Sequence, residues 1–114
     1  MYLKTNVRFH LEGPERNDPD FLGQCIADIN LVRKPDLVVM DATEFILTNG
    51  PSGPGEMKKE NKVVAGTDIV AVDAYCAGFL EREADEVAAI QKASALGLGN
   101  INYKDLKIKE TKMA

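Results

Sequence analysis

The sequence has no tryptophan, one histidine and two cysteines, and no apolar run approaches the length of a membrane span. A helix that crosses a bilayer needs about 20 consecutive apolar residues, so we expect no membrane association. Basic residues number 14 against 18 acidic ones, which disfavours a nucleic-acid partner because phosphate binding needs a basic surface. The N-terminus shows no apolar segment of a signal peptide. These absences predict a cytoplasmic chain.

The cysteines and the histidine exclude several kinds of site. Cys25 and Cys76 are too far apart in the sequence for a C-x-x-C pair or for the ligand spacing of zinc or an iron–sulfur cluster. Each falls in an apolar helical pattern, which is typical of a small buried side chain. His10 has no cysteine or serine placed beside it by a motif. We therefore expect neither an iron–sulfur cluster nor a nucleophilic triad in this chain.

The 114 residues, 45% of them apolar, fit a single α/β domain over residues 1–114. Hydrophobic periodicity predicts strands at 2–11, 36–41, 62–66 and 106–109, and helices at 18–34, 69–80 and 85–96. The valine-rich strands 36–41 and 62–66 are expected to be buried on both faces, and 42–61 is expected to be a long irregular loop. The alternation predicts a two- or three-layer, mostly parallel sheet with about three helices.

Helix boundaries are marked by local signals. Asp18 followed by Pro19 is a favourable helix start, and Pro35 ends the same helix. Asp85 is the predicted cap of the last helix, and Gly97 is its stop signal.

Three aspartates are candidate metal ligands. Asp41 ends the strand 36–41, Asp68 follows the strand 62–66, and Asp73 lies within an apolar helix. The ends of parallel strands meet at one crevice, where carboxylates could hold a divalent cation or act as acid and base. Each has a structural alternative: Asp68 as a helix cap, Asp41 as a turn residue bonded to its own loop, and Asp73 as a strut bonded to a neighbouring loop.

A glycine- and proline-rich segment supplies the candidate ligand-binding residues Asn49, Gly50 and Gly53. Its backbone N–H groups could bind an anion as a nest. It has the spacing of neither phosphate-binding fingerprint, so a plain surface loop is the alternative.

Four ordered blocks resemble the domain of unknown function called family three-six-two. The blocks are Cys25 to Leu31, Lys34 to Ala42, Asn49 to Gly53, and Val64 to Ala74, and the late segment Ala95 to Gly99 resembles the family's ending. The resemblance extends over about residues 20–110. It implies that only the C-terminal portion of a longer family domain is present. The chain is then either a fragment or a short relative that completes its sheet by self-association or with another chain.

The resemblance also implies that some relatives carry an appended ferredoxin-like module and are iron–sulfur proteins, with the cluster ligands in that module. No residue of this chain inherits a cluster from it. Three hypotheses follow. The chain binds a divalent cation or a small anionic ligand at an aspartate-lined crevice, or it is a non-catalytic subunit of an electron-transfer system that forms a homo-oligomer or binds a partner protein, or it is a structural fragment. The sequence identifies no reaction and leaves open whether the chain is an enzyme.

Overall fold

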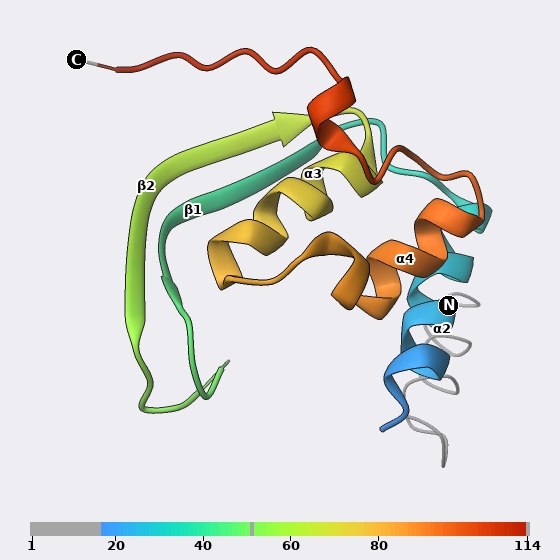
Figure 1. Ribbon diagram of the computed structural model, residues 1–114, viewed down its shortest axis with the longest axis horizontal. Helices are drawn as coiled ribbons and strands as arrows, with labels where there is room; N and C mark the ends of the chain where they lie inside the picture. The colour runs from blue at the N-terminus through green and yellow to red at the C-terminus, as the bar shows by residue number, and fades with distance from the viewer. Residues whose placement is uncertain (1–16, 51, 114) are drawn as a thin grey trace.

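The computed structural model describes residues 17–50 and 52–113 (Figure 1). Its elements, in chain order, are α2 (Pro19–Val32), β1 (Val38–Ile46), β2 (Met57–Gly66), α3 (Ile69–Ala77), η1 (Gly78–Leu80), η2 (Ala84–Glu86), α4 (Ala88–Ala95) and η3 (Tyr103–Asp105). The mixed α/β class and the three predicted helices are confirmed. The strand predicted at 2–11, with His10, lies outside the described residues. Among the described helices, none has the length and apolar character needed to cross a membrane.

Helix α2 begins and ends where the sequence predicts. The Asp18 carboxylate accepts a hydrogen bond of 3.0 Å from the backbone N–H of Asp20, and Pro19 occupies the first helical position, where its missing N–H costs nothing. Arg33 is already extended, which fits the restriction that Pro35 places on the chain before it.

Within residues 17–50 and 52–113 the sheet is a two-stranded antiparallel hairpin, so the prediction of a mostly parallel sheet is wrong. The segment 42–61, predicted as a loop, mostly extends the two strands and leaves only 47–56 as the connection. A connection this short closes a hairpin, whereas parallel strands need a crossover of a dozen or more residues. The charged run in β2 concealed the strand. Lys59 is paired in the register with Glu44 of β1, and Lys58 forms an ion pair with Glu60.

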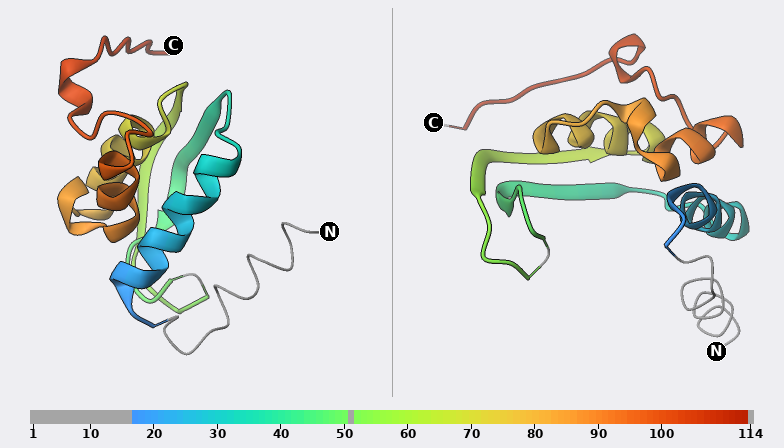
Figure 2. Two further views of the ribbon diagram at one scale, coloured as in Figure 1. Left: turned by 90° about the vertical axis from the view of Figure 1, so that its right-hand side faces the viewer. Right: turned by 60° about the horizontal axis from the view of Figure 1, so that its bottom comes forward.

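The two faces of the hairpin differ, although both strands were predicted to be buried on both faces. On the inner face Ala42 is 2% exposed, whereas on the outer face Val39 is 60% and Val63 is 66% exposed. Helix α3 covers the inner face closely enough that a Cβ at Gly66 would lie 2.8 Å from Val72. Figure 2 shows α3 and α4 on the same side of the hairpin. The expected burial on both faces is therefore wrong for the described part of the chain.

The core lies between α3 and α4. Its buried members are apolar throughout: Val70, Ala74, Ala77, Ile90 and Leu98. Tyr75 adds edge-on ring contacts to Phe79 and Tyr103, each with ring centroids 5.4 Å apart. Helix α2 packs against α4 through Gly23, where a Cβ would lie only 2.8 Å from the backbone of Ala88 and Ala89. Small residues thus set the helix spacing around the core.

Two predictions in the C-terminal third are wrong. Asp85 does not cap α4, because Glu83 and Glu86 form a capping box around the short η2 turn and Val87 precedes α4. Gly97 does end the helix as predicted, with a left-handed φ of 75°. Residues 106–109 form no strand in the described structure. Leu106 and Ile108 are 39% and 52% exposed, so this segment has no buried face to hold it in a sheet.

Candidate functional site

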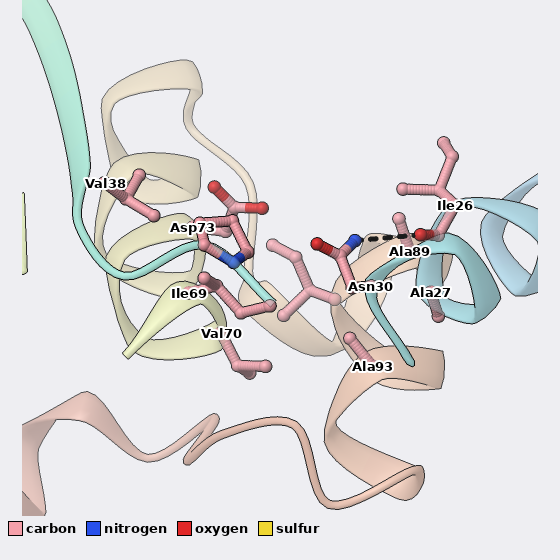
Figure 3. Close-up of a pocket in the computed structure, with 11 residues that line it drawn as sticks. Ile26, Ala27, Asn30, Val38, Ile69, Val70, Asp73, Ala89 and Ala93 are labelled. Carbon is pink, nitrogen blue, oxygen red and sulfur yellow. Dashed lines mark hydrogen bonds between the residues drawn. The ribbon is translucent and has the colours of Figure 1, made fainter. Parts of the chain in front are cut away.

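A hollow opens between α2, the start of β1, α3 and α4 (Figure 3). Its volume is about 190 Å³, and its lining is almost entirely apolar. Ile26 and Ala27 come from α2, Ile69 and Val70 from α3, and Ile90 from α4. The hollow exists because small residues bring α2 and α4 together, while Pro35 turns the chain away from α2 before β1 begins.

Among the described residues that line the hollow, Asp73 is the single ionisable one. It lies in the middle of α3, where its helix neighbours Val72 and Ala74 are buried and Asp73 itself reaches the surface. Its carboxylate accepts no hydrogen bond and forms no ion pair among the described residues. The apolar surroundings partly desolvate the carboxylate and raise its pKa above the ordinary value. A partly desolvated anion without a partner favours a cation beside it.

Asn30 supplies the second polar group in the wall. Its side-chain amide nitrogen donates a hydrogen bond of 2.9 Å to the Ile26 carbonyl oxygen. Because a carbonyl can only accept, this bond fixes which end of the side chain is the nitrogen. The amide oxygen consequently turns toward the middle of the hollow (Figure 3). The hollow therefore offers hydrogen-bond acceptors from Asp73 and Asn30.

Cys76 lies one turn along α3 from Asp73 and is half-buried. Burial, and secondarily the charge of Asp73, raise the pKa of its thiol. A raised pKa keeps the thiol protonated and unreactive at neutral pH. Cys25 is buried, as expected for a small side chain in an apolar helix.

Asp68 has a structural position at the start of α3. One carboxylate oxygen accepts the Ala71 N–H at 2.9 Å, and the other accepts the Asn100 N–H at 3.0 Å. A Cβ at Gly99 would overlap the first of these oxygens, so only glycine allows the segment after α4 to pass this close. Asp68 therefore caps α3 and holds the chain after α4 against it, as the capping alternative proposed.

Asp41 lies on the exposed outer face of β1. Its carboxylate accepts the Thr43 N–H at 2.9 Å, and hydrogen bonds from the Thr43 side chain and backbone lower its pKa. This is the local bonding of the turn-like alternative. The described residues contain no group of three or more histidine, cysteine, aspartate or glutamate side chains arranged to hold a metal ion. The structure does not assemble Asp41, Asp68 and Asp73 into such a group.

Asn49, Gly50 and Gly53 belong to the hairpin connection, which lies far from α2 and α4 in Figure 1 and in the right-hand view of Figure 2. Asn49 adopts a left-handed φ of 55°. Its carbonyl accepts the Gly53 N–H at 2.8 Å, and its side chain donates to Pro54 at 3.3 Å. A Cβ at Gly53 would lie 2.6 Å from the Asn49 oxygen. The geometry of the turn therefore explains why asparagine and glycine occur here. Anion binding at this turn stays a prediction.

The sequence singled out Asp73 but gave no weight to Asn30 or Asn100. Asn30 follows Ile26 by four residues, so both lie on one face of α2. A polar residue continuing an apolar stripe was the available signal. Asn100, by contrast, contacts Asp68 through its backbone N–H, and such a contact cannot be predicted from the type of residue.

Comparison with known proteins gives one match. The family described as Domain of unknown function (DUF362) matches residues 2–78, about two thirds of the chain. This match begins earlier and ends earlier than the expected 20–110, and it leaves Ala95 to Gly99 outside the matched residues. No curated protein and no solved structure matches the chain. The chain belongs to the DUF362 family of domains of unknown function.

Proposed function

We propose that this domain binds a small organic cation, an ammonium group on a short apolar body, in the hollow beside Asp73. The observation that carries the proposal is the Asp73 carboxylate, which has no partner among the described residues and stands in an apolar wall. An ammonium would form a charge-assisted hydrogen bond with it. The Asn30 amide oxygen offers a second acceptor.

The size and chemistry of the hollow define the ligand class. A cavity of about 150 Å³ accommodates benzene, so 190 Å³ admits a body of similar size. A carboxylate repels an anion, so we revise the anionic ligand expected from the sequence. A lone carboxylate is also a poor site for Mg²⁺ or Ca²⁺, which take six or more oxygen ligands, and for Zn²⁺, which takes three or four protein ligands.

The test is an NMR titration of the full chain with n-butylammonium, followed through backbone amide shifts. We expect shifts concentrated at Asn30, Val70, Asp73 and Ile90, with a dissociation constant of about 1 mM for so few ligand atoms. Asp73→Asn should weaken binding at least tenfold. Asp85→Asn removes the same charge from an exposed acid outside the hollow and should leave binding unchanged.

Two further probes distinguish the alternatives. Butyrate has the same apolar body with the opposite charge and should not bind. Mg²⁺, Mn²⁺, Ca²⁺ and Zn²⁺ test the metal-binding prediction for Asp41, Asp68 and Asp73. Equal binding of butyrate, or metal-induced shifts centred on Asp73 without an amine response, would overturn the proposal.

A further inference from the structure

The outer face of the hairpin is an apolar surface that no other described element covers. We define the outer face as Leu37, Val39, Val63 and Ala65. Leu37, Val39 and Val63 are each 60–66% exposed, and Val39 pairs directly with Ala65 across the strands. Sheets normally bury one face and solvate the other with polar side chains. An outer face of valines and a leucine is instead typical of an interaction surface.

The hairpin also has few strands with which to support itself. Two-stranded sheets are marginal in water without further packing, and among the described residues α3 and Phe79 of η1 cover only the inner face. A second layer on the outer face would bury the exposed valines and give the sheet cover on both sides.

Charges at the two ends of the outer face indicate what covers it. Arg33 and Lys34 precede Leu37, and with Asp36 they give that end a net charge of +1. Asp41, which pairs with Val63 across the strands, and Glu44 lie beyond Val39, and with Lys59 they give the other end a net charge of −1. These charges are exposed and loosely paired, with contacts of 3.4 Å (Arg33–Asp36) and 3.9 Å (Lys59–Glu44), so they can change partners at little cost.

We infer that the outer face binds a second copy of this chain. A two-fold axis near the Val39–Ala65 pair places the basic end of each copy opposite the acidic end of the other, while the Val39 side chains meet in the middle. An interface with two-fold symmetry needs a surface that complements itself, and a patch with opposite charges at its ends has this property. The inference stands independently of the ligand in the hollow.

The test is sedimentation velocity of the full chain over a wide concentration range, with variants on and off the outer face. We expect a reversible dimer. Val63→Lys should raise the dimer dissociation constant at least tenfold, because it places a charge on the apolar surface that the interface buries. The control is Ile108→Lys, which adds the same charge at a similarly exposed apolar residue elsewhere and should leave dimerisation unchanged.

A charge exchange tests the orientation. Asp41→Lys should weaken the dimer by setting like charges against each other, and Asp41→Lys combined with Lys34→Asp should restore it. Equal thermal unfolding midpoints at concentrations where each variant is monomeric would show that the monomers remain folded. A monomer at every concentration, a dimer indifferent to Val63→Lys, or no rescue by the double exchange would overturn the inference.

Discussion

The hollow and the outer face are both apolar surfaces open to solvent, yet they differ in shape and in the placement of charge. The hollow is concave, and one carboxylate, Asp73, stands in its wall without a partner. The outer face is a strand surface on which Val39 and Val63 are well exposed, and charges of opposite sign lie toward its two ends, with Asp41 across the strands from Val63. Concavity suits a small ligand that buries most of its surface, and an open sheet face suits a second protein surface.

Sequence periodicity predicted the structure around the hollow better than the structure of the outer face. Apolar stripes predicted the helices that enclose the hollow. The strands that carry the outer face were predicted to be buried on both faces, because the sequence does not distinguish an exposed valine from a valine buried in a core.

The largest expected effect comes from breaking the support of the hollow at Asp68. Asp68→Ala removes the cap of α3 and the tie to the Asn100 N–H, and should lower the free energy of unfolding by about 2 kcal/mol. Urea denaturation measures this change. Asp68→Asn retains a carbonyl oxygen for one of the two hydrogen bonds and should lower the free energy of unfolding by about half as much. Equal losses of stability in the two variants would show that Asp68 does not act through both hydrogen bonds.

Next in size is a crossed pair of variants that separates the two surfaces. Val63→Lys should change dimerisation at least tenfold, equivalent to about 1.4 kcal/mol, while leaving n-butylammonium binding intact. Asp73→Asn should do the reverse. Sedimentation and NMR titration of both variants give the comparison. If either variant changed both dimerisation and n-butylammonium binding, the two surfaces would be coupled.

A smaller effect is expected where α2 meets α4. Gly23→Ala adds a methyl 2.8 Å from the α4 backbone, and the overpacking should outweigh the gain in helix propensity and destabilise by about 1 kcal/mol. Gly78→Ala is the matched control, because its Cβ would meet nothing within 4 Å and its φ of −60° suits alanine. It should stabilise slightly. Thermal unfolding would contradict the packing account if both substitutions stabilised.

The smallest effect is on the pH dependence of stability. Desolvation raises the pKa of Asp73 in the folded state, so the folded chain holds this proton more tightly than the unfolded chain. The destabilisation is present above the raised pKa and disappears as pH falls below the unfolded value. Asp73→Asn should therefore stabilise at pH 7 by about 0.5 kcal/mol or less, given its exposure. Urea melts at pH 7 and pH 3 should show the gain only at pH 7.

Local signals in the sequence predicted most of the helical structure. Asp18 and Pro19 start α2, Asp68 starts α3, and Gly97 ends α4 as expected. Each works through contacts within a few residues, so no knowledge of the tertiary fold is needed. The DUF362 membership was likewise visible in ordered blocks of sequence.

Sheet topology was beyond local reasoning. The charges of Lys58, Lys59 and Glu60 resembled a loop because their partners, Glu44 and the carbonyl of Phe79, are distant in sequence or on the other strand. Without the hairpin, the parallel-sheet assumption placed Asp41 and Asp68 at one crevice. The antiparallel register places Asp41 on the outer face instead.

The proposed function requires that an organic cation bind beside the Asp73 carboxylate. The most direct measurement is the Asp73 carboxyl ¹³C shift during a pH titration, with and without saturating n-butylammonium. A bound ammonium favours the charged carboxylate, so we expect n-butylammonium to lower the pKa of Asp73 from its raised value. Butyrate should leave this pKa unchanged. If the pKa of Asp73 were the same with and without the amine, the proposed binding of an organic cation beside Asp73 would be wrong.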